Sequence, residues 1–301
     1  MNEQGVERDE TKMRRSSLGK MLLLAVPFLL TGCRDRFLVL DPAGPVAETE
    51  YNMIVLSAVL ISIVVIPVIG LLIYIVRKYR DRPGNDAPYQ PEWADSKRLE
   101  IVWWGIPIVI IAVLSVFTVR DTFALTQPPS DQEPVTIQVT SLDWKWMFQY
   151  PESGVATVNY AKIPAGVPVQ FVLTSDAPMN SFWVPQLGGQ TYTMPGMAMR
   201  MWLQADQPGT YYGHGANFTG KEFAKMEFDV IAEKPSEFKE WTKQVKESKP
   251  KMTKEDYKQL KEPGVVEEKT FSSYPSDLFK EIVMKNGGIY RKEEHQHILN
   301  D

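Results

Sequence analysis

Two long apolar segments lie in the first half of the chain. Tyr51–Val76 and Ile101–Val119 contain no Asp, Glu, Lys or Arg. A helix that crosses the hydrocarbon core of a bilayer needs about 20 apolar residues. The pattern therefore predicts a transmembrane helical hairpin over residues 51–120, with a polar loop over 77–100, and it argues against a purely soluble protein.

The pattern changes to short alternating runs in the second half. Turns rich in Gly and Pro separate these runs, as at Pro151–Gly154 and Asp206–Gly209. The expected strands lie within Val135–Thr140, Trp144–Tyr150, Val167–Leu173, Thr191–Trp202, Gly209–Gly213 and Phe223–Ile231. Strands of this length and spacing are typical of an antiparallel β-sandwich or barrel. We therefore expect a membrane-anchored all-β protein whose outer domain covers residues 125–232.

The last segment, residues 233–301, is polar and rich in lysine. Ser236, Thr253 and Ser276 are candidate N-caps of three helices, so a helical extension is predicted. His295 and His297 are interpreted as part of a solvated tail. Packing of this extension on the outer domain and packing on another subunit are both compatible with the sequence.

The first 32 residues have the pattern of a signal peptide. A basic stretch, Met13–Lys20, precedes the apolar stretch Met21–Leu30, and the apolar stretch is too short to be counted as a span of the mature protein. The sequence Leu-Thr-Gly-Cys that ends at Cys33 is similar to a bacterial lipobox. We expect cleavage before Cys33 and lipidation of its thiol, with residues 33–50 as an outer segment. A free or buried cysteine is the alternative.

Basic residues predict the orientation of the hairpin. The loop between the two apolar segments carries Arg77, Lys78, Arg80, Arg82, Lys97 and Arg98. Phe37–Glu50 carries no Lys or Arg, and Arg120 alone follows the second segment closely. Because basic loops remain in the cytoplasm, both mature termini are expected on the extracytoplasmic side of a bacterial cell membrane. An exported Cys33 requires the same topology.

Composition excludes several classes of site and partner. The formal net charge is −4, from 33 basic and 37 acidic residues, so there is no electrostatic signature of nucleic-acid binding. A single cysteine rules out an intrachain disulfide and any metal site built from several cysteines. Three histidines leave little for a histidine-rich metal site. We interpret His214 as a surface loop residue.

Three motifs make the outer domain recognisable: Asp143–Trp146, Met179–Gly188 and Ala205–Gly213. Together they strongly resemble subunit II of the haem–copper respiratory oxidases, and the resemblance extends over about residues 40–231. It implies a cupredoxin-like sandwich on the outer face of the catalytic subunit I. In copper-bearing relatives an aromatic patch near the first motif lies by the cytochrome docking surface. We expect Trp144 and Trp146 to serve in packing.

The resemblance also implies which residues stand at the copper-ligand positions. Cytochrome c oxidases hold a dinuclear copper centre there with two cysteines, two histidines, a methionine and a glutamate carbonyl. In this chain the corresponding positions carry Asn180, Gly215, Asn217, Thr219 and Phe223, and Met226 alone is kept. Amides and hydroxyls cannot replace bridging thiolates, so no copper centre and no other redox cofactor is expected in this chain. In lacking the copper ligands, this chain is similar to the quinol oxidase branch of the family.

The quinol oxidase branch implies a function for the complex. Such an oxidase takes electrons from membrane quinol, reduces oxygen to water and translocates protons. Its haems and copper belong to subunit I, which also binds the quinol, and smaller membrane subunits and the lipid bilayer are further partners. Two alternatives stay open: a cytochrome c oxidase subunit II that lost copper or drifted, and a cupredoxin-like membrane lipoprotein that binds a partner.

Glu100 is the candidate for a chemical role. It begins the second apolar helix on the cytoplasmic side, where a carboxylate is favoured by the helix dipole alone. With Glu100–Trp103 and Pro107, this segment resembles the start of the family's second helix. In the family, that glutamate stands at the mouth of a proton-uptake channel into subunit I. The resemblance therefore implies proton entry at Glu100, and helix capping is the alternative.

Overall fold

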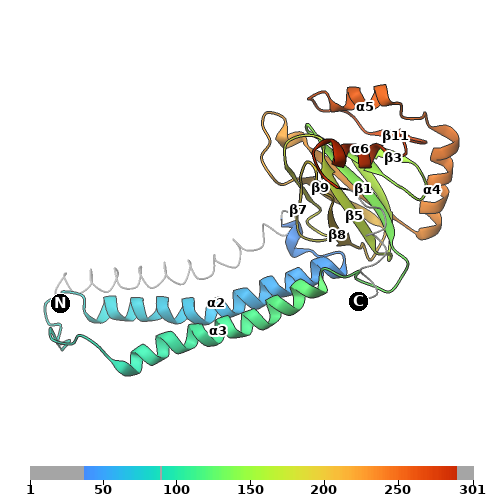
Figure 1. Ribbon diagram of the computed structural model, residues 1–301. Helices are drawn as coiled ribbons and strands as arrows, with labels where there is room; N and C mark the ends of the chain where they lie inside the picture. The colour runs from blue at the N-terminus through green and yellow to red at the C-terminus, as the bar shows by residue number, and fades with distance from the viewer. Residues whose placement is uncertain (1–36, 89, 290–301) are drawn as a thin grey trace, which may run out of the picture. The chain divides into compact units, whose positions relative to one another are not determined.

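The structure, a computed structural model, describes residues 37–88 and 90–289 (Figure 1). The predicted signal segment, Cys33, His295 and His297 lie outside the described residues. A short 3₁₀ turn, η2, covers Leu38–Leu40 near the start of the described chain. The remaining elements form a helical hairpin, a β-sandwich and a C-terminal extension.

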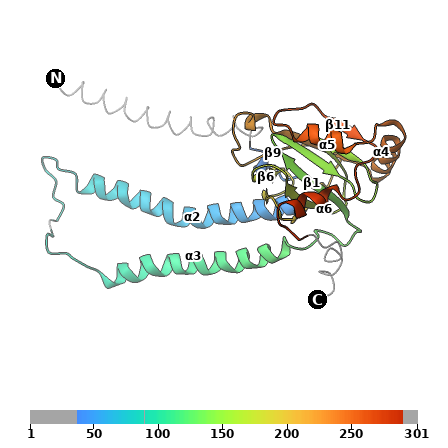
Figure 2. The ribbon, with the colours of Figure 1, turned by 45° about the horizontal axis from the view of Figure 1, so that its top comes forward.

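The two apolar segments form long helices. Helix α2 spans Pro45–Lys78 and helix α3 spans Lys97–Ala124, and both are long and apolar enough to cross a membrane. The helices lie side by side in Figures 1 and 2. Each contains an internal proline, Pro67 or Pro107, which membrane helices tolerate better than soluble ones do. Helix α2 begins six residues before the uncharged segment, because its first turns belong to the outer domain.

The outer domain is a sandwich of two sheets, which confirms the predicted fold class. The six-stranded sheet has the order β11-β3-β2-β1-β5-β8, and the five-stranded sheet has the order β4-β10-β9-β6-β7. In the first sheet the bounds are β1 Val135–Leu142, β2 Lys145–Gln149, β3 Ala156–Val158, β5 Val169–Ser175, β8 Met199–Leu203 and β11 Lys269–Phe271. In the second they are β4 Tyr160–Pro164, β6 Asn180–Trp183, β7 Thr191–Thr193, β9 Gly209–Gly215 and β10 Glu227–Glu233.

Three details differ from the predicted antiparallel sandwich. The run Phe223–Ile231 was expected to be extended throughout, but Phe223–Lys225 forms a 3₁₀ turn and the strand covers Glu227–Glu233. Strand β1 pairs with β5 in parallel, and so does β4 with β10, so both sheets are mixed. The run Thr191–Trp202 was expected as one segment but is divided into β7 and β8. The break contains Pro195, which lacks an N–H for the ladder, and Gly196, whose φ of +77° ends the extended conformation.

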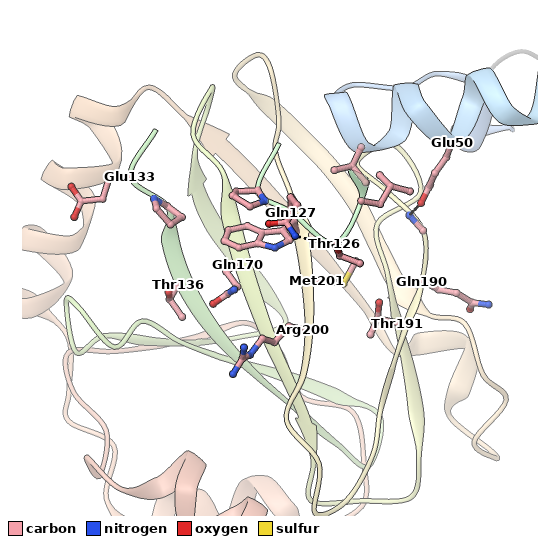
Figure 3. A pocket seen from close by; sticks show the side chains of 16 residues that line it. Glu50, Thr126, Gln127, Glu133, Thr136, Gln170, Gln190, Thr191, Arg200 and Met201 are labelled. Carbon is pink, nitrogen blue, oxygen red and sulfur yellow. Dashed lines mark hydrogen bonds between the residues drawn. The ribbon is translucent and has the colours of Figure 1, made fainter. Parts of the chain in front are cut away.

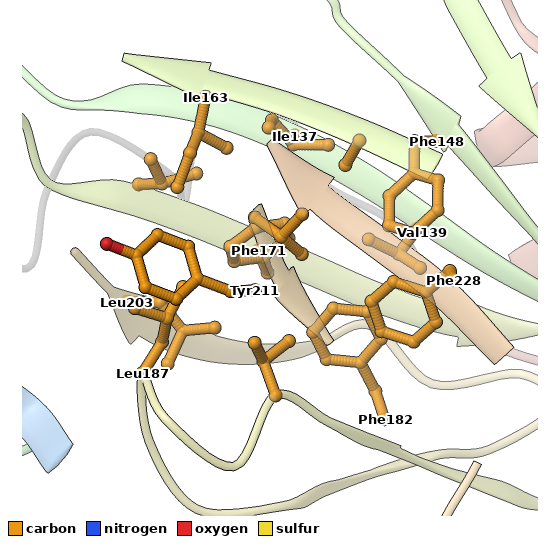
Figure 4. Packing of buried hydrophobic residues seen from close by; sticks show 14 of the residues in the cluster. Ile137, Val139, Phe148, Ile163, Phe171, Phe182, Leu187, Leu203, Tyr211 and Phe228 are labelled. Carbon is orange, nitrogen blue, oxygen red and sulfur yellow. The ribbon is translucent and has the colours of Figure 1, made fainter. Parts of the chain in front are cut away.

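Alternation along the strands builds the core between the sheets. Phe148, Phe171, Phe182 and Phe228 meet there (Figure 4). The rings of Phe182 and Phe228 stack with centroids 4.9 Å apart. Each of these four side chains is almost fully buried, and burying one side chain of this size contributes about 1.5–3 kcal/mol. The core is therefore made by side chains from both sheets.

The C-terminal extension packs on the sandwich (Figure 1). Its helices are α4 Pro235–Ser248, α5 Lys254–Lys261 and α6 Leu278–Lys285, and its strand β11 pairs with β3. The N-cap prediction at Thr253 is confirmed, since its hydroxyl accepts a hydrogen bond from the N–H of Asp256. The other two predicted N-caps are wrong by one or two residues, because Lys234 and Asp277 occupy those positions.

Candidate functional site

The copper-ligand positions of the family come together at one end of the second sheet. Asn180 starts β6 and Gly215 ends β9. The N–H of Gly215 donates to the carbonyl of Met226 over 3.0 Å, which joins the end of β9 to the start of β10. A short 3₁₀ turn, η3, covers Phe223–Lys225 between them. The residues that the sequence analysis assigned to the copper-ligand positions therefore lie close together in the fold.

The side chains of Met226 and Phe223 lie beside Gly215. A Cβ atom added to this glycine would lie 3.3 Å from the sulfur of Met226 and 3.8 Å from the ring of Phe223. The ring of Phe223 in turn contacts Phe218 edge to face, with centroids 5.6 Å apart. Apolar packing thus takes the place of a ligand set here.

Two side-chain amides of this loop donate to backbone carbonyls nearby. The side-chain amide of Asn180, which is 1% exposed, donates to the carbonyl of Pro178 over 3.2 Å. The amide of Asn217 donates to the carbonyl of Met179, also over 3.2 Å. One thioether and neutral amides do not form a copper centre. Among the described residues, no group of three or more His, Cys, Asp or Glu side chains could hold a metal ion.

The two tryptophans of the Asp143–Trp146 motif lie next to this loop and contact it or the core beneath it. Trp146 is fully buried, and its ring meets Phe182 and Phe228 edge to face at 5.3 and 5.5 Å. Trp144 adopts a left-handed backbone conformation with φ of 60°. Its indole N–H donates to the carbonyl of Thr219 over 3.2 Å. The geometry thus gives both aromatic residues a packing role that requires no copper.

Lys145 connects the same motif to the C-terminal extension. Its side chain is 1% exposed, and its ammonium donates to the carbonyls of Glu262 and Gly264 over 2.6 and 2.8 Å. Burial lowers the pKa of this ammonium below its usual value, although Asp143 and Glu262 oppose the shift. The sequence analysis missed this residue, because a lysine between two tryptophans resembles a solvated strand position.

The prediction for His214 is wrong. This residue lies in β9 and is half-buried, not in a surface loop. Its ring packs between Tyr212 and Trp183, with centroids 5.4 and 5.1 Å away, and its Nδ1 lies 2.9 Å from the carbonyl oxygen of Gly215. The alternation of Tyr212 and His214 along one strand face was the signal in the sequence.

Glu100 lies in the first turn of α3, as expected from the sequence. Its backbone N–H donates to the carbonyl of Ser96, the N-cap residue, over 3.0 Å. The side chain is exposed. This position is compatible both with a helix-start carboxylate and with a proton-collecting group that faces water.

Comparisons with known proteins agree with this geometry. The family described as cytochrome c oxidase subunit II, periplasmic domain, matches residues 155–233. A quinol oxidase subunit 2 of Bacillus cereus is 46% identical over 260 residues, which cover 85% of this chain and 89% of the relative. The quinol oxidase subunit 2 of Bacillus subtilis is 47% identical over 257 residues, with coverages of 84% and 80%.

More distant relatives extend the comparison. The cytochrome bo(3) ubiquinol oxidase subunit 2 of Pseudomonas putida is 40% identical over 285 residues, covering 93% of this chain and 90% of the relative. The crystal structure of the periplasmic domain of a cytochrome oxidase subunit II from Bradyrhizobium japonicum is 22% identical, covers 38% of this chain and 94% of that domain, and has a TM-score of 0.37.

The relatives decide between the three interpretations of the sequence. Similarity to the quinol oxidase proteins extends through the hairpin and the sandwich, so the chain is a membrane protein with an extracytoplasmic domain and works in an oxidase complex. The chain belongs to the quinol oxidase subunit 2 family, within the cytochrome c oxidase subunit II superfamily.

Proposed function

We propose that the complex passes electrons from membrane quinol to haems and copper in subunit I with no metal centre in this chain, and that it translocates protons. One observation carries the proposal: the amides of Asn180 and Asn217 donate to carbonyls of the chain itself, and Met226 alone remains of the family's copper ligands. A soluble cytochrome delivers its electrons through the dinuclear copper centre in copper-bearing relatives, so a chain without that ligand set needs a donor that reaches subunit I directly. The sandwich then serves as a structural domain against subunit I and smaller membrane subunits.

Metal content and electron donor test this proposal together. The purified complex should contain copper only in the amount that the haem–copper site of subunit I requires. Oxygen consumption should be supported by a quinol and not by reduced cytochrome c. Additional copper with a mixed-valence signal, or turnover with cytochrome c, would contradict the proposal.

We further propose that Glu100 collects protons for subunit I. Support comes from its place in the first turn of α3, its exposure and its match to the proton-entry glutamate of the family. A carboxylate at a water-exposed rim exchanges protons with water, and ionisable groups at the edges of membrane bundles commonly mark proton paths. The surrounding loop, residues 77–100, is then on the cytoplasmic side.

Substitution of Glu100 tests the proton-entry role. Glu100→Ala should slow oxygen reduction about tenfold, which corresponds to about 1.4 kcal/mol on the limiting barrier, while haem content and assembly stay intact. Glu100→Asp should retain more activity because it keeps the carboxylate. Glu92→Ala, which removes an exposed acid from the same loop, is the matched control. Wild-type turnover of the Glu100→Ala complex across the pH range would leave Glu100 as a helix-start residue.

The topology of the chain and its lipid anchor are a separate part of the proposal. We propose that a signal segment ends before Cys33, that Cys33 carries a lipid, and that both mature termini are extracytoplasmic. The basic residues of the 77–100 loop support this topology through the positive-inside rule. Since two spans already anchor the chain, the lipid would position the N-terminal segment.

A further inference from the structure

The chain that follows α2 turns back toward the end of the helix. Helix α2 ends at Lys78, and a tight turn begins at Arg82. In this turn the backbone N–H of Asn85 donates to the carbonyl of Arg82 over 3.2 Å. Pro83 occupies the second position of the turn, and Gly84 occupies the third with φ of +79°. Proline followed by a residue with positive φ is typical of a type II turn.

The side chain of Asn85 completes the end of the helix. Its amide donates to the carbonyl of Lys78 over 3.2 Å and to the carbonyl of Arg80 over 2.9 Å. The last carbonyls of an α-helix have no partner within the helix, so the amide supplies one. A guanidinium nitrogen of Arg82 also lies 3.5 Å from the carbonyl oxygen of Arg77 in the last turn. The loop is therefore held against the helix end.

Four exposed basic residues are brought together in this way, and we call them the basic cap of α2: Arg77, Lys78, Arg80 and Arg82. No ion pair among the described residues includes any of the four. Residues 77–86 contain these four cations and two acids, Asp81 and Asp86, which leaves a net charge of +2. The helix dipole favours cations within its last turn only, so it does not explain the two arginines that follow the helix.

The basic cap lies at the depth of lipid headgroups. Val76 ends the uncharged stretch that begins at Tyr51. That stretch is about 39 Å long and fits a hydrocarbon core of about 30 Å when the helix tilts. Arg77 and Lys78 follow Val76 by about 1.5 and 3 Å along the helix, whereas the headgroup layer extends about 5–8 Å beyond the hydrocarbon. The contact between Arg82 and the carbonyl of Arg77 keeps Arg82 at a similar depth.

Two tyrosines give an independent sign of this depth. The ammonium of Lys78 donates to the hydroxyl of Tyr74 over 3.1 Å. It also lies over the rings of Tyr74 and Tyr79, 5.4 and 5.5 Å from their centroids. Tyrosine is enriched where a membrane helix passes the headgroup layer. The aromatic rings thus hold one cation of the basic cap at the membrane surface.

We propose that the basic cap of α2 binds the headgroup of an anionic phospholipid such as phosphatidylglycerol. Guanidinium groups offer paired N–H donors that suit a phosphate, and clusters of Lys and Arg beside a membrane helix attract anionic lipids. Phosphatidylethanolamine is disfavoured, because its ammonium would lie beside four cations. The positive-inside rule depends on the number of charges alone. The proposed site, in contrast, requires the turn and Asn85 to hold the charges together, whichever side of the membrane the basic cap faces.

Native mass spectrometry of the whole oxidase complex tests the proposal. The complex is delipidated and then exposed to equal amounts of phosphatidylglycerol and phosphatidylethanolamine with the same acyl chains. The double variant Arg80→Gln, Arg82→Gln should retain one phosphatidylglycerol fewer than wild type. The double variant Lys97→Gln, Arg98→Gln removes the same charge from exposed positions at the other end of the same loop. It is the matched control and should retain as many as wild type.

Asn85→Ala covers the case in which loss of charge prevents assembly. It keeps every cation and removes both hydrogen bonds of the Asn85 amide to the helix end, so it should also lose one phosphatidylglycerol. Equal counts in wild type and the assembled variants would overturn the proposal. So would an equal loss in the two double variants, which would show that charge anywhere in the loop suffices. Loss of a protein subunit with unchanged lipid counts would identify the basic cap as a protein contact and would overturn the proposal too.

Discussion

Glu50 accepts a hydrogen bond from the backbone N–H of Gly189, with 2.9 Å between Oε1 and N. This contact binds the second turn of α2 to the loop after β6. Just before the helix, the backbone N–H of Ala43 donates to the carbonyl of Gln186 over 2.8 Å. The carbonyl of Ala43 accepts a hydrogen bond from the backbone N–H of Asp206 over 3.0 Å. Val46 of the first turn is part of the sandwich core. The membrane helix and the outer domain are therefore one packed unit at this junction.

Gly44 is the tightest point of that junction. A Cβ atom on this glycine would lie 1.8 Å from the carbonyl oxygen of Gln204, and a backbone atom cannot move aside cheaply. Gly44→Ala should therefore destabilise the junction by about 3 kcal/mol, the upper end of the range for overpacking, and lower the thermal stability of the complex. Gly209→Ala is the control, since its Cβ would meet Tyr211 at an ordinary 3.5 Å. Equal melting temperatures for the two variants would contradict the tight packing at Gly44.

Asp176 joins the sandwich to the last two helices of the extension. Its carboxylate is 4% exposed and receives hydrogen bonds from Lys285 and from the hydroxyl of Tyr257, both over 2.7 Å, and lies 3.0 Å from the ammonium of Lys261. Burial alone would raise the pKa of Asp176, but these three partners outweigh it and hold the pKa below its usual value. The ionised carboxylate therefore stabilises the fold.

The sign of this pKa shift predicts an acid-sensitive extension. Because the folded pKa is lower than the unfolded value of about 3.9, the stabilisation is complete above that value and is lost as the pH falls through the folded pKa. The protection factors of the amides in α5 and α6, which correct for the slower intrinsic exchange in acid, should fall on acidification below about pH 4. Asp176→Asn should raise exchange already at neutral pH and weaken the pH dependence. Glu281→Gln, which removes an exposed partner of Lys254, should change little.

The sequence predicted those parts of the fold that local pattern determines. The spans are defined by uninterrupted apolar residues, and the strands by alternation and turns. The first turns of α2 escaped prediction because Glu48 and Glu50 interrupt the apolar pattern, although Val46 is buried by the distant β8 and the β6–β7 loop. Strand β11 escaped because it has three residues and forms by pairing with β3. Long-range packing decides both cases.

The candidate site was predicted only as far as the family motifs reach. The residues at the former copper positions were identified by their place in the motifs. A pocket lined by Arg200 and Trp202 (Figure 3) was not predicted, because residues from five separate parts of the chain line it. No local pattern reports that Gln170 and Trp202 become register partners. His214 was misplaced because Gly213 and Gly215 on either side are typical of a turn, yet both pack inside β9.

Lys145 should stabilise the conformation of the segment between α5 and β11. Lys145→Met removes both hydrogen bonds to the carbonyls of Glu262 and Gly264 and leaves these acceptors without the ammonium. The expected cost is about 1–3 kcal/mol, seen as faster hydrogen exchange between α5 and β11 with the sandwich still folded. Lys269→Met, at an exposed position of β11, should leave this exchange unchanged. Unchanged protection in Lys145→Met would show that the segment is held by other contacts.

Cys33 gives a prediction about the mature N-terminus. Intact-mass measurement of the chain from the native membrane should find residue 33 as the first residue and a diacylglyceryl group on its thiol. Cys33→Ala should still insert and retain activity, because two spans anchor the chain. An unmodified cysteine, or a mature chain that keeps the segment before it, would refute lipidation.

Restoring the copper ligands tests how far the loop has departed from the copper-bearing relatives. The combined variant carries Asn180→His, Gly215→Cys, Asn217→Glu, Thr219→Cys and Phe223→His, and keeps Met226. The new side chain at Gly215 would meet the flexible thioether of Met226 at 3.3 Å, a contact that a shift of a few tenths of an ångström relieves. Phe223 is only half-buried, so its replacement should leave the sandwich folded.

We therefore expect the combined variant to bind copper and to develop the absorption of a thiolate-bridged centre. Wild type should stay colourless after the same treatment, since its amides and hydroxyls cannot replace thiolates. Adding Met226→Leu to the combined variant should change the spectrum, because it removes the one family ligand that this chain retains. Circular dichroism shows whether the combined variant is folded, and so separates loss of the fold from loss of copper binding. A folded combined variant without colour would show that the backbone, and not only the ligand set, has lost the geometry of the copper site.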